Sequence, residues 1–206
     1  HNTNWQNNNI LQSLFYAAND MDDGFICSYS DILYTSEVVK KILDSTADIT
    51  IAIDTDWRAR YIHRRFHPTT DAEKVTADND RITALSRTIP DKAAAGEFIG
   101  LAKFSPAGAK IFKEYFYNLP EDFQFEKDIP LNRAYLLHFL NYLVQQGVKI
   151  NFVTTHGNYI EVDTLEDYAY AQKFWQSSPE LFSASVVGSL PRPQFVQDII
   201  LNDNDP

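Results

Sequence analysis

The segment 49–53, ITIAI, limits most strongly what this chain can fold into, because β-branched residues dominate it and none of its residues is charged. Such a run is typical of a strand that is buried on both faces of a parallel sheet. Apolar residues recur with helical spacing over 36–43 and 107–117, and a second strand pattern covers 96–104. Strands that alternate with helices predict a mixed, mostly parallel α/β sheet with helices on its faces.

The other elements follow from the same local signals. Further helices are expected over 8–21, 132–146 and 164–175, and further strands over 24–29, 149–154 and 159–162. Gly147 follows the second of these helices, where a glycine commonly ends a helix. Weak alternation around 74–85 predicts extended segments or a β-ribbon, and 118–130 reads as a loop rich in proline and acidic residues.

The composition is that of an ordinary globular chain, with 206 residues of which 44% are hydrophobic and 22% charged. This is enough for one well-filled domain or slightly more. The formal net charge is -10 and the pI is near 4.8, so the phosphates of nucleic acids and anionic lipid surfaces should repel the chain. We therefore expect no nucleic acid and no membrane as a partner, and an anionic ligand would need a local basic patch or a bound cation.

Cysteine usage points to a reducing compartment. Cys27 lies in an apolar run without a second cysteine to pair with, so a disulfide framework is excluded. The polar start, HNTNWQNNN, has neither the basic nor the apolar part of a signal peptide, and no apolar run approaches the ~20 residues of a membrane span. We expect a cytoplasmic protein.

Aspartates stand where several predicted strands end. Asp31 follows the strand 24–29, Asp54 and Asp56 follow 49–53, and Asp163 follows 159–162. In open α/β sheets, ligands bind beyond the carboxyl ends of the strands, so these acids can converge on one crevice. Mg²⁺ is commonly held by one or two carboxylates together with substrate phosphates. The alternative for each aspartate is a local role, and for Asp163 it is capping of the helix that begins near Thr164.

Basic residues crowd into the segment 57–67, WRARYIHRRFH, although the chain as a whole is acidic. Guanidinium groups that bind a phosphate or phosphonate would explain this concentration. The alternative is a solvated face paired with local acids. Lys103, in the strand 96–104, is a further candidate for an anion contact, with a surface lysine as its alternative.

Several motifs of nucleotide and metal chemistry do not occur. The seven glycines form neither a GxGxxG pattern nor a phosphate-binding loop. There is no cluster of cysteine and histidine with metal-ligand spacing, and His156 has no serine or cysteine partner that spacing would mark as a nucleophile.

Five blocks, collinear and sensibly spaced, resemble the nucleotidyltransferases of the sugar-phosphate superfamily. Within it they are most similar to the cytidylyltransferases that act on phosphocholine or hydroxyethylphosphonate. The blocks are NNILQSL (8–14), GFICSYSDILYT (24–35), ITIAIDTDWRARY (49–61), GEFIGLAKFS (96–105) and HGNYIEVDTLEDY (156–168).

This resemblance implies a nucleotide-binding, nucleotide-diphospho-sugar-transferase-like (Rossmann-like) α/β fold with Mg²⁺ held by Asp31 and Asp163. It also implies in-line attack of a phosphate or phosphonate oxygen on the α-phosphorus of a nucleoside triphosphate, expected to be CTP, with release of pyrophosphate. Such a step depends on orientation and on charge neutralisation by the metal. Asp31 and Asp163 are therefore the expected catalytic and metal-binding residues.

The resemblance extends to the residues around this pair. The acceptor is expected near Trp57, Arg58, Arg60, Lys103 and Glu161, and the nucleotide near Asn8 and Ser30. Ser30 stands where the family usually has glycine. A quaternary ammonium on the acceptor would call for an aromatic cage that includes Trp57 or Tyr159. A simple phosphonate would instead be bound mainly by the arginines, and the basic segment favours this second case.

The family's N-terminal strand and glycine-rich loop, which bind the triphosphate, do not appear in this sequence. Either the chain is a fragment of a longer polypeptide, or another chain supplies that part, or activity is lost; the first is favoured. We expect residues 1–178 to be a nucleotidyltransferase-like domain that lacks its N-terminal part, and 179–206 to be a linker or the start of a fused or adjacent unit. The stretch VVGSLPRPQF (186–195) is similar to the opening of the cobalamin-independent methionine synthase barrel.

Two other functions stay open at this point. Asp54-Thr55-Asp56 is a DxD arrangement that can ligate a metal bound to a sugar nucleotide, as in a GT-A-type glycosyltransferase. The absent glycine-rich loop also suits a non-catalytic nucleotide-binding domain. Convergence of Asp31 with Asp163 would favour nucleotidyl transfer, whereas Asp54 and Asp56 on one ion would favour glycosyl transfer.

Overall fold

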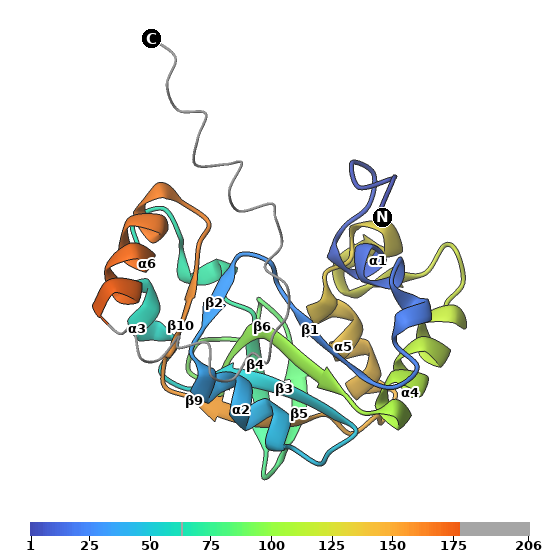
Figure 1. The fold of residues 1–206 in the computed structure, drawn as a ribbon. Coiled ribbons are helices and arrows are strands. Elements are labelled where there is room, and N and C mark those ends of the chain that lie inside the picture. Colours follow the sequence, from blue (N-terminus) through green and yellow to red (C-terminus); the bar gives the residue numbers. More distant parts are fainter. Residues whose placement is uncertain (63, 178–206) are drawn as a thin grey trace.

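The computed structural model describes residues 1–62 and 64–177, and a six-stranded sheet forms their centre (Figure 1). Its strands follow one another in the order β1 (Phe25–Ser28), β6 (Gly96–Phe104), β3 (Ile49–Asp54), β9 (Asn151–Thr155), β5 (Arg81–Leu85) and β4 (Lys74–Asp78). The predicted α/β fold with helices around a mixed sheet is confirmed.

The prediction that most strand pairs are parallel does not hold among the described strands. β3 and β9 run parallel, with Ile51 opposite Phe152, whereas the other pairings within this sheet are antiparallel. The long strand β6 shows why, because it is buried along almost its whole length and yet lies between antiparallel neighbours. A continuous apolar run indicates burial on both faces and carries no information on strand direction.

Helices cover both faces of the sheet. They are α1 (Ile10–Phe15), α2 (Ser36–Asp44), α3 (Arg58–Tyr61), α4 (Pro106–Tyr117), α5 (Leu136–Gln145) and α6 (Leu165–Ser177). α1, α4 and α5 pack on one face and α2 on the other, while α3 and α6 lie together at one end of the sheet (Figure 1). The expected N-terminal helix over 8–21 is shorter than predicted, because α1 ends at Phe15 and a separate 3-10 turn follows at Ala18–Asp20.

The alternation of side chains along the central strands divides the core into two clusters. Ile51 and Ile53 of β3 point to the face covered by α4 and α5, where Phe112 and Phe139 fill the larger cluster. Ala52, between the two isoleucines, points to the opposite cluster around α2. The sheet is therefore buried on both faces, as the composition of β3 predicts, and its ends are left to carry polar side chains.

A second, two-stranded ribbon lies beside the sheet and positions the site. It pairs β2 (Ile32–Tyr34) with β10 (Tyr159–Glu161) in antiparallel register, with Ile32 opposite Glu161. A further two-residue pair, β7 (Gln124–Phe125) with β8 (Ile129–Pro130), lies within the expected loop 118–130. The expected β-ribbon around 74–85 is the β4–β5 hairpin.

The remaining predictions concern the end of α5, the residues outside the described ranges, and membrane-spanning helices. Gly147 has a φ of +84° just beyond α5, as expected for a glycine that ends a helix. His63 of the basic segment and the expected C-terminal unit 179–206, with its methionine-synthase-like stretch, lie outside the described residues. None of the helices in the described part of the chain has the length and hydrophobicity that a bilayer-spanning segment needs.

Candidate active site

Asp31 and Asp163 line one cavity of about 250 Å³. Asp31 directly precedes β2 and Asp163 follows β10, and these two strands pair with each other. The backbone N–H of Val162 donates to the carbonyl oxygen of Asp31 over 2.8 Å, so the ribbon itself brings the two aspartates together. Two acids that lie far apart in the sequence therefore converge on the same cavity.

The Asp163 carboxylate is not used to cap the helix that follows it. Thr164 and Asp167 do this instead: the Thr164 hydroxyl accepts from the Asp167 backbone N–H over 3.2 Å, and the Asp167 carboxylate accepts from the Thr164 backbone N–H over 2.9 Å. This reciprocal pair satisfies the first N–H groups of α6. The Asp163 side chain is thereby left to face the cavity.

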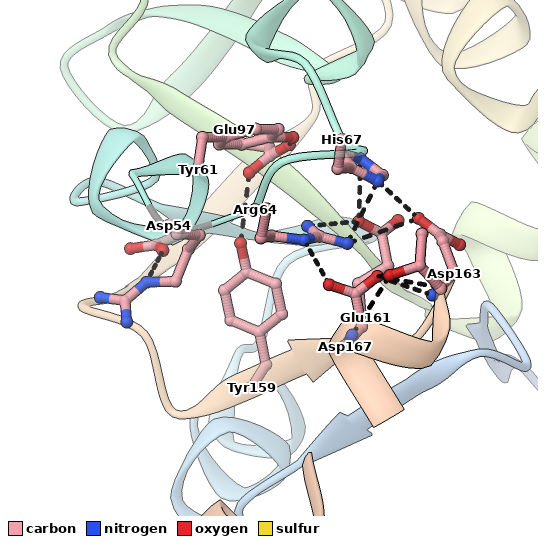
Figure 2. A network of polar contacts seen from close by, with 11 residues as sticks. Asp54, Tyr61, Arg64, His67, Glu97, Tyr159, Glu161, Asp163 and Asp167 are labelled. Atoms are coloured by element: carbon pink, nitrogen blue, oxygen red, sulfur yellow. Dashed lines mark hydrogen bonds and ion pairs between the residues drawn. The ribbon is translucent and has the colours of Figure 1, made fainter. Parts of the chain in front are cut away.

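A basic pair from the loop after α3 lies against these acids (Figure 2). His67 Nδ1 is 2.9 Å from Asp163 Oδ2, and His67 Nε2 is 3.6 Å from Glu161 Oε2. Arg64 contacts Glu161 at 3.4 Å and Asp163 at 3.5 Å, and its Nε donates to Asp167 over 2.7 Å. Glu161, predicted as a substrate contact, thus belongs to the same cluster as Asp163.

Several acidic side chains lie close together in this cluster, and their burial and mutual repulsion shift their pKa values. Burial, with repulsion from Asp163, raises the pKa of Glu161 to about 7. Burial raises the pKa of Asp163 as well; Asp31 adds to this, and His67 opposes it. Burial and the neighbouring Arg64 lower the pKa of His67, and Asp163 opposes this shift. The site holds more negative charge than its own cations balance, which suits a bound metal ion.

Two further carboxyl groups, Glu97 and Glu73, are buried in the wall of the cavity. Glu97, on β6, accepts hydrogen bonds from the hydroxyls of Tyr61 and Tyr159 (Figure 2). Burial, opposed by the Tyr61 hydrogen bond, raises the pKa of Glu97 to about 8. Tyr29 donates to Glu73 over 3.0 Å, and burial raises the pKa of Glu73. Tyrosine rings with carboxyl groups behind them therefore form much of this wall.

Arg87 is the guanidinium in this wall. It donates to Glu73 over 3.1 Å and lies over the ring of Tyr135 at 4.7 Å. Its buried Nε has no hydrogen-bond partner among the described residues. The charge of Arg87 is thus partly balanced by Glu73.

Residues predicted to contact the acceptor are only partly brought to the cavity. Trp57 is 2% exposed and packs in a core cluster with Tyr61 and Ala72, so the expectation that Trp57 contacts the acceptor, as part of an aromatic cage or otherwise, is corrected. Arg58 donates to the backbone carbonyl of Asp91, away from the cavity. The family resemblance implied that both residues lie near the acceptor, but neither side chain lines the cavity of Asp31 and Asp163.

Two other basic residues have structural partners. Lys103 donates to the carbonyl oxygen of Leu43 over 2.8 Å and also to that of Ser45, so it binds the C-terminal end of α2 rather than a ligand. Arg60 pairs with Asp54 at 3.3 Å and lines a second cavity of about 340 Å³ next to α6. Neither side chain lines the cavity of Asp31 and Asp163.

The two residues expected at the nucleotide lie outside this lining as well. Asn8 is 9% exposed, and its side-chain oxygen accepts from Asn2 over 2.8 Å. Ser30 is exposed in the turn before Asp31. Ile10, from the same block as Asn8, does line the cavity.

The DxD arrangement does not present two free carboxylates in this structure. Asp54 is fully buried; its Oδ1 accepts from the backbone N–H of Gly157 over 3.1 Å, and its Oδ2 faces Arg60. Asp56 is exposed and pairs with His156 at 3.3 Å. Asp54 thus fixes the turn at Gly157, and the glycosyltransferase alternative loses its motivating feature.

Several residues of the cavity could not be found from spacing. Glu73, Glu97 and Arg87 come from three separate strands or loops, and no short motif links them. The signal for Glu97 is its position inside the mostly apolar block GEFIGLAKF, since a carboxylate there needs a partner or a function. In the sequence, His67 stands out only as one member of the basic segment 57–67.

Comparison with known proteins supports the predicted resemblance. In sequence, the chain is 25% identical over 174 residues to a CTP:phosphoglutamine cytidylyltransferase of Campylobacter jejuni, a match that covers 81% of this chain and 68% of that protein. In structure, it is similar to the inositol-1-phosphate CTP transferase from T. maritima, with a TM-score of 0.58 and 18% identity. The chain has the nucleotidyltransferase fold. The same TM-score and 10% identity relate it to a putative glucose-1-phosphate thymidylyltransferase from Bacillus anthracis.

The nucleotidyltransferase-like chain is shorter than these solved structures. The matches cover 86% and 82% of this chain, but only 63% and 61% of the T. maritima and B. anthracis chains. No protein-family model matches the sequence. The roles predicted for individual residues, Asp31 and Asp163 included, stay predictions.

Proposed function

We propose that this nucleotidyltransferase-like chain transfers CMP from CTP to a small acceptor that carries a phosphate or phosphonate, with release of pyrophosphate. The observation that carries the proposal is the pairing of β2 with β10, which brings Asp31 and Asp163 to one cavity. The similarity to a cytidylyltransferase and to an inositol-1-phosphate CTP transferase supports CTP as the donor.

Asp31 and Asp163 fit a hard divalent cation, because both offer carboxylate oxygens to the same cavity. The acidic side chains there also carry more negative charge than the nearby basic side chains balance. These two residues would hold Mg²⁺. The ion would neutralise charge on the triphosphate and on the leaving pyrophosphate. In the reaction, an oxygen of the acceptor's phosphate or phosphonate forms a bond to the α-phosphorus of CTP. The bond from that phosphorus to the oxygen bridging to the β-phosphorus breaks, and pyrophosphate leaves with that oxygen.

The chain's own contribution to this step is to position the acceptor. The wall formed by Tyr29, Tyr61 and Tyr159, with Glu97 behind two of these rings, would exclude water and offer hydrogen bonds to the body of a small molecule. A volume of about 250 Å³ suits an acceptor of few atoms. The names of two relatives, which act on phosphoglutamine and inositol-1-phosphate, agree with a phosphate-bearing acceptor.

We also propose that the protein works in the cytoplasm. Cys27 is a buried free thiol, and burial raises its pKa to about 11, so it is an inert core residue of the kind that needs no oxidising compartment.

The test is release of pyrophosphate from CTP by the full-length protein with Mg²⁺, using phosphocholine, hydroxyethylphosphonate, inositol-1-phosphate and phosphoglutamine as acceptors. Asp31→Asn and Asp163→Asn should each lower kcat/KM on the order of 100-fold or more, because each removes a metal ligand worth several kcal/mol. Asp80→Asn is the matched control, since Asp80 is exposed at the β4–β5 turn and pairs with Lys149.

Two results would contradict the proposal. Absence of pyrophosphate release with every acceptor, while the protein still binds CTP, would indicate a non-catalytic nucleotide-binding domain. Full activity in both aspartate variants would contradict the assignment of Asp31 and Asp163 to the active site, even if the protein catalyses the proposed reaction.

A further inference from the structure

His67, Glu161 and Asp163 form a compact group that differs in chemistry from the aspartate pair. Each offers one ligand atom, and these atoms all lie within 4.8 Å of one another. All three residues line the cavity that also contains Asp31. The imidazole comes from the loop after α3, whereas both carboxylates come from the end of β10 and the turn that follows, so only the tertiary fold assembles the group.

The donor set decides which ion such a group prefers. Mg²⁺ takes oxygen ligands almost entirely and loses its waters reluctantly. An imidazole nitrogen beside two carboxylates instead favours first-row transition metals such as Mn²⁺ and Co²⁺, whose affinity for nitrogen ligands is higher. A site with His67 as a third ligand would therefore bind Mn²⁺ more tightly than Mg²⁺.

The structure already places a cation against this group. The Arg64 guanidinium contacts Glu161, Asp163 and His67, the last through Nη2 at 3.1 Å from Nδ1, and its side chain is only 15% exposed (Figure 2). A metal ion at the same ligand atoms would have to displace these contacts, because two positive charges cannot share them. The 2.7 Å contact of Arg64 Nε with Asp167 lies to one side of the group and can persist when the others open.

We propose that His67, Glu161 and Asp163 bind a divalent first-row transition-metal ion, such as Mn²⁺, in preference to Mg²⁺, and that Arg64 is the internal cation that this ion displaces. The proposal deepens the proposed function, because it assigns metal selectivity to the same site, yet metal binding can be measured without any reaction. Arg64 is a competitor for the carboxylates in this scheme and is not itself a ligand.

The test measures binding of Mn²⁺ alone to the full-length protein, by the loss of the free-ion electron paramagnetic resonance signal, with Mg²⁺ as competitor. The unmodified protein should bind Mn²⁺ at least about 10-fold more tightly than Mg²⁺. His67→Gln should weaken Mn²⁺ binding by roughly 10- to 100-fold and leave Mg²⁺ affinity within a few-fold. Arg64→Gln should strengthen Mn²⁺ binding several-fold, because the competing charge is gone.

The two variants should change Mn²⁺ affinity in opposite directions. Loss of folding would weaken Mn²⁺ binding in both variants, so the two explanations can be distinguished. His156→Gln is the matched control, since His156 also pairs with a carboxylate, Asp56, but is exposed and outside the cavity. It should bind Mn²⁺ like the unmodified protein.

A spectroscopic measurement on the unmodified protein makes the result independent of any variant. Nitrogen hyperfine coupling to bound Mn²⁺ would support His67 as a ligand, and its absence would overturn the proposal. Unchanged Mn²⁺ affinity in His67→Gln, or weakened affinity in Arg64→Gln, would overturn it too. Release of pyrophosphate with Mg²⁺ would stand in either case, so failure here and failure of the proposed function are distinguishable.

Discussion

Glu97 is a buried carboxyl group that the hydroxyls of Tyr61 and Tyr159 hold in the wall of the cavity (Figure 2). It has no basic partner in an ion pair among the described residues, and Glu161 and Asp54 add repulsion to the effect of burial. Its pKa is about 8 against an ordinary 4.5, so near neutral pH the group is mostly protonated.

This raised pKa makes stability depend on pH in a definite direction. The folded chain keeps the Glu97 proton up to about pH 8, whereas the unfolded chain loses it near 4.5. The contribution of Glu97 to stability is therefore complete below pH 4.5 and is lost as the pH rises through 8. Glu97→Gln should remove this loss, because glutamine keeps the shape and stays neutral.

Above pH 8, Glu97→Gln should exceed the unmodified protein in free energy of unfolding by on the order of 3–5 kcal/mol, with little difference near pH 5. Urea unfolding at both pH values measures this. Glu114→Gln serves as control, because Glu114 is exposed on α4 and should leave the profile unchanged. Parallel pH profiles for the unmodified protein and Glu97→Gln would show that Glu97 ionises normally.

At the scale of elements, α4 depends on a close approach to the segment before β3. Ser105 caps the helix by accepting from the Gly108 backbone N–H over 3.0 Å, and its hydroxyl donates to Asp48 over 2.7 Å. A Cβ on Gly108 would overlap with the backbone carbonyl oxygen of Asp48. Gly108 thus lets the first turn of α4 lie directly on the chain that enters β3.

Gly108→Ala should therefore destabilise the protein by roughly 3 kcal/mol or more, since backbone atoms on both sides have to shift. Gly147→Ala is the matched comparison: its Cβ would meet no atom within 4 Å, but the φ of +84° is strained for alanine. That strain should cost about 1 kcal/mol. Thermal unfolding of both variants measures the difference, and equal effects would mean that α4 can move away without cost.

At the scale of the whole molecule, the net negative charge lowers the stability of the folded state. There are 28 acidic and 18 basic residues, and several of the acids converge on one cavity. Self-repulsion of a net charge of -10 destabilises the folded state, and salt screens it within about 10 Å at moderate concentration.

We expect the unfolding temperature at pH 8 to rise by roughly 2–4 °C between low salt and about 0.5 M NaCl, which corresponds to ~1 kcal/mol for a chain of this size. Near pH 5, close to the pI of about 4.8, the rise should nearly vanish because little net charge remains. Differential scanning calorimetry at both pH values decides this. A fall in the unfolding temperature with salt at pH 8 would mean that favourable ion pairs, such as those of Arg64, outweigh the repulsion.

Helices and strands could be predicted from the sequence because the signals that determine them lie within each element. The apolar periodicity of α2 and α4, the β-branched run of β3 and the glycine after α5 each act within one element, and each lies close to where it was expected. The convergence of Asp31 and Asp163 was expected from the ends of their strands and from the family resemblance, and the structure brings both to one cavity.

Only the tertiary structure decided strand direction, the burial of Trp57, the engagement of Lys103 by α2, and the meeting of Glu97 with Tyr61 and Tyr159. It also decided that Thr164 and Asp167 cap α6, so that Asp163 can face His67. The physical reason is that most of these contacts join segments from different parts of the fold. In the case of α6, the residues that face Asp163 across the cavity determine which of the neighbouring side chains caps the helix. Composition and periodicity indicate which segments are buried, whereas the partner of a buried charge is decided only when the strands are in register.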